Sequence, residues 1–431
     1  METGFSPDKR QDLRLEERLP ARLRLAKNSE AVLEAKTGNI SLSGVLLDLD
    51  SKQKNLGKKV WLEMVSSPFG SVITTNAEVV WHNAVEGGAS RVGLRFLDLN
   101  DTKKEEILKL LLERLMPSKE DRLIFKAPDR RLSEKESRSL EILDLLRRQG
   151  PVSISYVSQA IGVNVVTTTN YLKDFLKKGI IVESGEDISS GGRRPNLIKF
   201  NPGLGYVIGL EANQKENFVL GILTDLSSKG VARIREEFAP GSNLAQRIAE
   251  LILRLIKICH LEREKILGIG LAGTGLSDLD FLREYLEQKT GLPVLAKHSF
   301  QVGVFAEKWL NSDLAAIDDL VYLDSPEHCS MIIGGRLYAG HSQEAGWVHA
   351  PHSDFKEILF CLISLLNPQA VVVSQELVEC REEFLNSFRE EMRRVLGGMN
   401  KLPTIIASTM GEDTAVAAMA SLVIREIFTQ I

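Results

Sequence analysis

The hydrophobic pattern changes character along the 431 residues of this chain, and these changes restrict the possible fold more than any other feature. Residues 30–99 carry short alternating runs broken by Gly, Asn and Ser, which is typical of β-strands. Residues 133–200 then follow the order helix, helix, turn, helix and hairpin, and strands alternate with helices from residue 206 onward. A chain of this length is expected to hold two to four domains, so the pattern predicts a multidomain protein.

Two short clusters near the start of the chain carry the residue types of an anion site. They form R-x-x-x-R and N-x-S-x-x-G, and their members, with one further Arg, are Arg14, Arg18, Arg22, Asn39, Ser41 and Gly44. Arginine grips a phosphate or the edge of a guanine with two hydrogen bonds, and Gly lets backbone approach a ligand closely. We interpret the clusters as two halves of one site for a doubly charged, purine-bearing ligand. The alternative is a solvated basic arm followed by an ordinary turn.

Residues 10–117 resemble a PilZ domain, the bacterial receptor module for cyclic di-GMP. The resemblance rests on the two clusters in their usual order and on a late strand, R-V-G-L-R-F, at 91–96. It implies a small antiparallel β-barrel with a C-terminal helix. In that family the Arg pair grips the guanines and phosphates, and the second cluster lines the barrel wall. One departure is that Glu16 and Glu17 lie between the two Arg residues, where many members are more basic.

A charged segment, 118–131, is predicted to link this domain to a winged helix-turn-helix at 132–202. Ser133 and Glu136 have the spacing of a capping box at the first helix. The third helix would enter the major groove, and the wing would reach phosphate or the minor groove. The residues predicted to contact double-stranded DNA are Asn164, Thr167, Thr168, Asn170 and Lys173 on the helix, and Arg193 and Arg194 on the wing. The alternative is a small helical domain used for protein contact.

Residues 133–431 resemble the repressor branch of the ROK family, which implies an α/β, actin-like, two-lobed domain at 203–431. The matching stretches are G-R-R-P at 192–195, G-Y-V-I-G at 205–209, G-I-G at 268–270, G-L-P-V at 291–294 and N-P at 367–368. ROK repressors associate through this domain. The resemblance therefore implies a homodimer that presents two winged helices to a two-fold operator.

The catalytic motifs of ROK sugar kinases do not carry over to this chain. The phosphate loop D-x-G-x-T reads E-A-N-Q-K at 211–215, and Ser299 stands where the family has its catalytic Asp. A Ser does not act as a carboxylate base at neutral pH. The nucleotide-contacting Gly-Gly is replaced by Ser374 and Gln375, and the sugar-binding G-E-x-G-H is altered at 346–349. We therefore expect no catalytic residues, no enzyme activity and no cofactor.

No metal site is predicted either. The zinc run C-x-C-G-x-x-G-C is absent, the four Cys include no C-x-x-C pair, and Cys361 lies in an apolar run that predicts a core position. His349 and His352 alone are weak indicators of a metal. His298 contacts a small ligand or merely lines the cleft, and Phe300 and Trp347 are expected to fill part of the former sugar pocket. Without an apolar leader or a long apolar stretch, the expectation is a cytoplasmic protein with no membrane partner.

These patterns together predict a cyclic di-GMP-responsive transcription regulator. With a net charge of -4, DNA binding requires a local basic patch. Two alternatives remain open. One is an adaptor in which cyclic di-GMP controls docking to a partner protein without DNA, and the other is a sugar kinase under second-messenger control.

Overall fold

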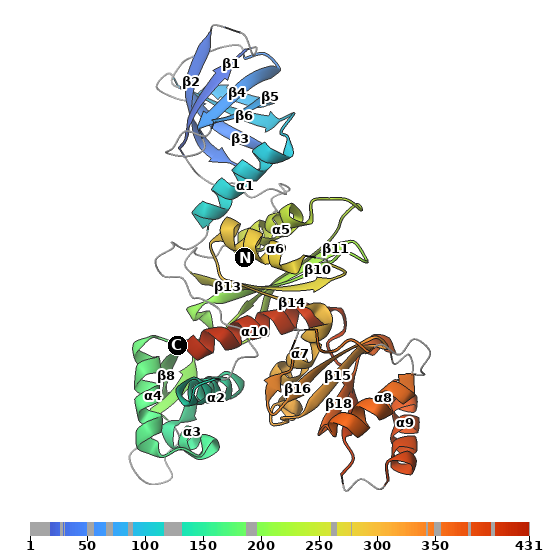
Figure 1. Ribbon diagram of the computed structural model, residues 1–431. Coiled ribbons are helices and arrows are strands. Elements are labelled where there is room, and N and C mark those ends of the chain that lie inside the picture. Colours follow the sequence, from blue (N-terminus) through green and yellow to red (C-terminus); the bar gives the residue numbers. More distant parts are fainter. Residues whose placement is uncertain are drawn as a thin grey trace, which may run out of the picture. The chain divides into compact units, whose positions relative to one another are not determined.

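A computed structural model gives the fold (Figure 1). It describes residues 18–25, 29, 31–49, 56–65, 72–84, 89–115, 132–186, 196–259, 265–276, 278–341, 344–348, 355–377, 381–397 and 401–430. The chain divides into two compact units. The first comprises residues 1–117 with two short stretches, 249–260 and 289–291, and the second comprises the remainder.

The first unit is built on a closed antiparallel barrel with strand order β1-β2-β3-β6-β5-β4. The strands are β1 (Pro20–Arg24), β2 (Val32–Ile40), β3 (Gly44–Leu49), β4 (Lys59–Val65), β5 (Val72–Ala84) and β6 (Ser90–Phe96). Alternation sets the two faces: on β1, Ala21 and Leu23 point into the barrel while Arg22 points outward. Closure pairs the edges of the sheet, which otherwise invite pairing with other chains. Helix α1 (Asp101–Leu115) follows. The predicted barrel with a C-terminal helix is confirmed.

The second unit begins with a winged helix-turn-helix. Its elements are α2 (Glu134–Arg148), β7 (Val152–Ser153), α3 (Ile154–Ile161), α4 (Val165–Lys177), β8 (Ile181–Glu186) and β9 (Asn196–Phe200). The predicted capping box is present: the N–H of Glu136 donates to the Ser133 hydroxyl, and the N–H of Ser133 donates to the Glu136 carboxylate. Gly162 ends α3 in the left-handed region, at φ 67°, which turns the chain into α4.

Two five-stranded sheets follow, with orders β12-β11-β10-β13-β14 and β17-β16-β15-β18-β19. In each sheet three antiparallel strands continue into two parallel ones, so the two lobes repeat one pattern. The strands are β10 (Tyr206–Asn213), β11 (Phe218–Asp225), β12 (Gly230–Glu237), β13 (Ile266–Thr274), β14 (Val294–His298), β15 (Leu320–Ser325), β16 (His328–Ile333), β17 (Arg336–Leu337), β18 (Ala370–Val373) and β19 (Thr404–Ala407). The helices are α5 (Leu244–Cys259), α6 (Leu279–Thr290), α7 (Gly303–Leu310), α8 (Phe355–Leu366), α9 (Arg381–Val395) and α10 (Thr414–Gln430).

Helix α10 joins the parts of the second unit. It packs against α2 of the winged helix, against α7, and against β10 and β13. Figure 1 traces it from the two-lobed part toward the winged helix, where the chain ends. Its buried residues belong to one hydrophobic core with Ile142 and Leu146 of α2 and with Leu320 and Val372 of the second sheet. The winged helix therefore shares its core with the lobes.

A polar contact reinforces this junction at the last turn of α2. Arg147 is almost buried, its guanidinium lies 4.4 Å from the Trp309 ring centroid, and it donates to Asp144 Oδ1 (2.6 Å) and to the Trp309 carbonyl (3.0 Å). Arg148 donates to the same carbonyl at 2.7 Å. That carbonyl lies near the C-terminus of α7, where unpaired carbonyls carry partial negative charge and favour a cation. Burial lowers the pKa of Arg147, and Asp144 opposes the shift.

We predict that Arg147→Ala lowers the stability of the second unit by about 2–3 kcal/mol, because a buried, charge-assisted set of hydrogen bonds is lost. Thermal unfolding of the full chain measures this. Arg138→Ala on the same helix is the matched control: its pair with Glu141 is half-exposed, so the change costs less than about 1 kcal/mol. Equal shifts for the two variants would contradict the prediction.

Candidate functional site

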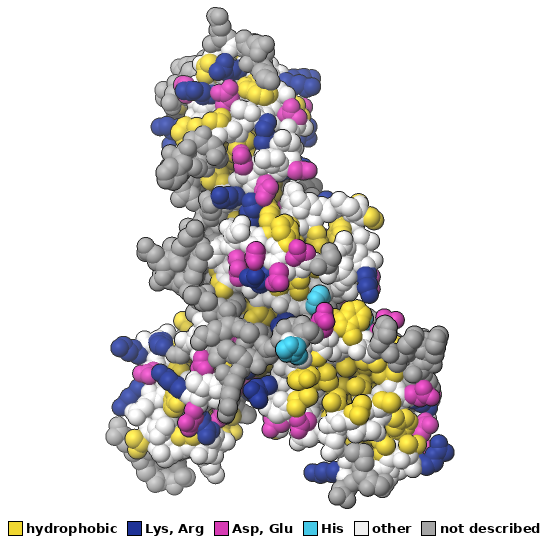
Figure 2. Space-filling view, in the orientation of Figure 1, with side chains coloured by type: hydrophobic (Ala, Val, Ile, Leu, Met, Phe, Trp, Pro, Cys, Tyr) yellow, Lys and Arg dark blue, Asp and Glu magenta, His cyan; other side chains and the backbone are white. Residues whose placement is uncertain are grey.

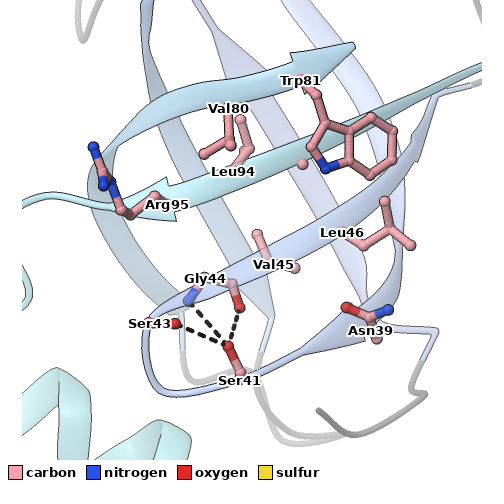
Figure 3. Close-up of a pocket in the computed structure, with 11 residues that line it drawn as sticks. Asn39, Ser41, Ser43, Gly44, Val45, Leu46, Val80, Trp81, Leu94 and Arg95 are labelled. Carbon is pink, nitrogen blue, oxygen red and sulfur yellow. Dashed lines mark hydrogen bonds between the residues drawn. The ribbon is translucent and has the colours of Figure 1, made fainter. Parts of the chain in front are cut away.

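A cavity of about 180 Å³ opens on the outside of the barrel, over the neighbouring strands β3, β6 and β5 (Figure 3). Its lining combines polar groups from the end of β2 and the following turn with a flat aromatic surface from β5. The lining residues are Asn39, Ser41, Ser43, Gly44, Val45, Leu46, Val80, Trp81, Gly93, Leu94 and Arg95. Three of the six residues predicted for the ligand site are among them.

Ser41 shapes the turn between β2 and β3. Its hydroxyl donates to the Gly44 carbonyl at 3.1 Å and accepts the Gly44 N–H at 3.2 Å, and its own N–H donates to that carbonyl at 2.8 Å. The Ser43 hydroxyl lies 3.4 Å from that of Ser41 and belongs to an exposed residue. Ser41 itself is buried, so its contribution is to hold the turn that presents Ser43 and Asn39.

Gly44 is required for a reason other than the predicted approach to a ligand. A Cβ at this position would lie 2.2 Å from the carbonyl oxygen of Leu94 on β6. No side chain fits there, because the clash is with backbone. The glycine in this motif therefore permits the close approach of β3 to β6, and it shapes the cavity through that pairing.

The sequence did not single out Trp81 as a site residue, yet it forms the largest apolar surface of the cavity. The β5–β6 register shifts between Val79 and Trp81, and Val80 and Trp81 are both exposed, at 61% and 41%. Such a bulge breaks the strict alternation of a strand, so two successive residues reach the same face. The indole lies over Gly93, where a Cβ would fall 2.4 Å from the indole nitrogen. Strict alternation of inward and outward side chains would not place Val80 and Trp81 on the same face, so no indication of this arrangement was present in the sequence.

Arg95 supplies a cation at the rim of the cavity and was also not predicted as a site residue. It lies on β6, is exposed, and forms an ion pair with Glu78 of β5. An exposed pair of this kind contributes little to stability, so an anionic ligand can replace the carboxylate at small cost. In the sequence, the alternate spacing of Arg91, Gly93 and Arg95, which places them on one face of a strand, was the pattern that could have indicated Arg95.

The arginines of the first cluster are placed differently. Arg14 lies outside the described residues, and Arg18 is exposed. Arg22 points outward from β1 and binds Glu34 at 3.0 Å. Neither Arg18 nor Arg22 lines the cavity. Their roles in ligand binding stay predictions.

On the winged helix, α4 presents part of the predicted DNA-contacting set. Asn164, Asn170 and Lys173 are exposed, and the Asn164 side chain caps the helix by accepting the N–H of Thr167 at 2.8 Å. Thr168 is fully buried, so the expectation that it offers an exposed donor is wrong. It shares the inward face of α4 with Leu172 and Phe175, at helical spacing.

Two residues of α4 that the sequence reasoning missed are more exposed than any predicted Thr. Val165 and Val166 are 50% and 72% exposed at the N-terminal end of the helix. Apolar side chains in a major groove contact the methyl group of thymine. Val165 and Val166 are therefore candidates for base contacts. Arg193 and Arg194 of the predicted wing lie outside the described residues.

Three side chains near the ends of β10, β13 and β14 contact one another. The Thr274 hydroxyl lies 2.7 Å from Ser299 Oγ and 3.4 Å from Glu211 Oε1. Burial, with help from the charges of Asp324, Glu216 and Glu412, raises the pKa of Glu211 to about 7. Glu211 occupies the place of the phosphate-loop Asp.

Beside this cluster, Phe300 packs against three other aromatic rings. Its centroid lies 5.7 Å from His298, 4.9 Å from His328 and 5.3 Å from Trp347. Burial and the charge of Lys215 lower the pKa of His328. The aromatic side chains predicted to fill the sugar pocket therefore pack together.

No group of three His, Cys, Asp or Glu residues able to hold an ion occurs among the described residues, which exclude His349 and His352. Cys361 is exposed on α8, so its predicted place in the core is wrong. Within the described ranges, no helix is both long and apolar enough to cross a membrane.

Comparisons with known proteins agree with both units. The PilZ domain family model matches residues 8–113. The xylose repressor of Bacillus subtilis (strain 168) is 22% identical over 384 residues, covering 70% of this chain and 98% of the repressor. That of Caldicellulosiruptor bescii is 25% identical over 243 residues, covering 52% and 60%. The structure of a ROK family transcriptional regulator, a homologue of the E. coli MLC protein, aligns with TM-score 0.54 at 12% identity, covering 68% of this chain and 97% of that one.

A barrel that matches the PilZ family thus precedes a unit with the fold of a ROK-family regulator. The chain is a fusion of a PilZ domain with a ROK-type unit, and this second unit is similar in sequence to xylose repressors. The resemblances expected from the motifs are confirmed.

Glu211 makes the stability of the second unit depend on pH. The pKa of Glu211 in the folded state, about 7, lies above its ordinary value of 4.5. The stability that its bound proton contributes is therefore fully present below pH 4.5 and is lost as the pH rises through 7. We predict that Glu211→Gln matches the wild type at pH 4 and exceeds it by roughly 3 kcal/mol at pH 8. Urea unfolding at both pH values checks this. The exposed Glu183→Gln, on β8, is the control, and an unchanged pH slope in Glu211→Gln would contradict the prediction.

Proposed function

We propose that this protein is a cyclic di-GMP-responsive transcription regulator that binds double-stranded DNA through its winged helix. The observation that carries the proposal is the barrel cavity that holds Asn39, Ser41 and Gly44 of the PilZ motif, in a chain whose other unit is similar to repressors. The proposed domain limits are 10–117 for the sensor, 118–131 for the linker, 132–202 for the winged helix and 203–431 for the ROK-like part.

In the proposed complex, the ligand's two guanines and two phosphates divide between the cavity and the N-terminal arginines. Trp81 offers a flat face on which a purine stacks, and Ser43 and Asn39 offer hydrogen-bonding groups around it. Arg95 turns from Glu78 toward a phosphate, and Arg14 and Arg18 bind the remaining anionic and guanine edges. Ligand binding would thereby bridge the chain before β1 and the cavity.

The second unit is proposed to regulate transcription without catalysis. Ser299 holds the place of the catalytic Asp, and its hydroxyl is engaged with Thr274. For cyclic di-GMP to change DNA binding, it must bind two arrangements of the chain with different affinities.

We expect calorimetric titration to detect cyclic di-GMP binding, and Arg14→Ala with Arg18→Ala to weaken it roughly a hundredfold, because charge-assisted hydrogen bonds are lost. Trp81→Ala should weaken binding at least about tenfold through lost stacking. Trp61→Phe, on β4 outside the cavity lining, is the matched control and should bind like the wild type. Absence of heat with the wild type, together with no quenching of Trp fluorescence by the ligand, would overturn the sensor assignment.

Genomic pull-down followed by gel-shift assays on the enriched sites tests the DNA-binding half. We expect Lys173→Ala, and Arg193→Ala with Arg194→Ala, to reduce affinity, and the wild-type affinity to fall steeply with salt because phosphate contacts release counterions. Lys135→Ala, exposed on α2, is the control. No enriched sites would instead favour the adaptor. Sugar-dependent ADP release would favour the kinase if it disappears in a variant with residues 211–215 deleted.

A further inference from the structure

A second cavity, of about 520 Å³, lies where the winged helix meets the lobe built on β15 to β19. One wall is a single face of α2, and the others come from α7, from the chain before β15, from the β16–β17 turn and from α10. The α2 residues recur at helical spacing, and they are Ser137, Leu140, Glu141, Asp144 and Arg148. Figure 2 shows basic and acidic side chains close together at this junction. The cavity has the size of a small-molecule site.

The carboxylates that α2 contributes to this cavity already have basic partners. Asp144 accepts hydrogen bonds from Arg147 at 2.6 Å and from Arg148 at 2.9 Å. Glu141 accepts one from Arg138 at 2.8 Å. Because these carboxylates are engaged, they offer little to a cationic ligand.

Two basic side chains of the cavity are less well satisfied. Arg336 of β17 is exposed, and within the described part of the chain it forms no hydrogen bond or ion pair. Lys308 of α7 is mostly buried; its amine donates to the Ile317 carbonyl and lies 3.7 Å from Asp318 Oδ1. Burial lowers the pKa of Lys308, and the charge of Asp318 opposes the shift. An anion in the cavity would gain charge-assisted contacts with both basic side chains.

The same cavity has apolar walls. Leu132 and Leu140 line it from the winged helix, and Phe305 and Trp309 line it from α7. The rings of Phe305 and Trp309 are stacked, with centroids 5.6 Å apart. A ligand that fits here presents an apolar body to these side chains and its charge to the two basic ones, which is the usual division of a small-molecule site.

We propose that this cavity binds a small organic anion, a carboxylate or a phosphate ester with an aromatic or aliphatic body. The proposal rests on the placement of Arg336 and Lys308 beside an apolar wall, in a cavity whose α2 carboxylates are already paired. A neutral apolar molecule would make no use of Arg336. The cavity shares no lining residue with the barrel cavity and does not include Glu211, Thr274 or Ser299.

A ligand here would act on the position of the winged helix. Because α2 and the lobe both supply walls, the ligand contacts all of them only while α2 keeps its place against α7. It therefore binds this arrangement more tightly than others and shifts the population toward it. The consequence for DNA rests on the proposed function, since α4 shares a hydrophobic core with α2. The binding site itself does not rest on it.

Titration of the full chain with 4-fluorophenyl phosphate and with 4-fluorobenzoate, followed by fluorine NMR, tests the site. We expect the wild type to bind at least one of them with a dissociation constant of about 1 mM or lower, and the tighter probe identifies the anionic group. Arg336→Ala should raise that constant at least about tenfold, because a charge-assisted contact is lost. Arg394→Ala, exposed on α9 outside the lining, is the matched control and should bind like the wild type. The neutral 4-fluorobenzyl alcohol should bind at least about tenfold more weakly.

Hydrogen exchange locates the bound probe. We expect the tighter probe to slow amide exchange in α2 and in residues 334–337, and to leave β3 and β6 of the barrel unchanged. Ser137→Phe adds bulk to the α2 wall, so it should remove both the binding and the protection, with circular dichroism confirming that the variant is folded. Binding that survives Arg336→Ala and Ser137→Phe, equal binding of the neutral probe, or no binding of either anion at about 10 mM would each overturn the site.

Failure of the proposed function is seen separately, because these titrations involve neither cyclic di-GMP nor DNA. On a DNA site enriched with the wild type, the tighter probe should change the affinity of the wild type but not that of Ser137→Phe. An unchanged wild-type affinity would overturn the link between the cavity and DNA binding. A chain that binds the anion in this cavity but binds neither cyclic di-GMP nor DNA would keep the site and overturn the proposed function.

Discussion

The burial of α10 is the constraint on which the second unit depends. A helix that hides most of its residues needs partners on every side, and here they come from the winged helix, from α7 and from the strands of the first lobe. Apolar burial stabilises all of these contacts together. Arg147 and Arg148 orient α2 against α7, because both donate hydrogen bonds to the Trp309 carbonyl near the end of α7. Helix α4 therefore shares the core that holds the lobes.

Side chains from β10, β13 and the segment after β14 form a second set of contacts in this unit. Thr274, Ser299 and Glu211 contact one another, and aromatic rings pack around Phe300 beside them. The segment Ser299–Gln301 directly precedes α7, whose other end receives Arg147. One end of α7 thus adjoins this set of contacts, and its other end contacts the winged helix.

The barrel illustrates how a motif and a site differ. Ser41 and Gly44 act mainly on the backbone, one by holding a turn and the other by letting two strands meet. Part of the exposed lining of the cavity comes from neighbours that the motif does not include, such as Trp81, exposed by a bulge, and Arg95, in an exposed ion pair with Glu78. The motif of small and polar residues thus indicates where the cavity lies more than which residues line its exposed surface.

The sequence by itself determined the barrel, the winged helix and the α/β lobes. Hydrophobic periodicity, the capping box and the ordered motifs can each be recognised from short stretches and from their order along the chain. It also carries the expectation that the catalytic residues of ROK kinases are replaced, since that comparison requires only residue identities at the positions of the motifs. The tertiary structure alone decided exposure. Thr168 turned inward and Cys361 outward, and the β5 bulge brought Trp81 into the cavity, because each depends on which neighbour covers a face. A local pattern records that a residue is apolar or polar, and only packing decides what lies against it.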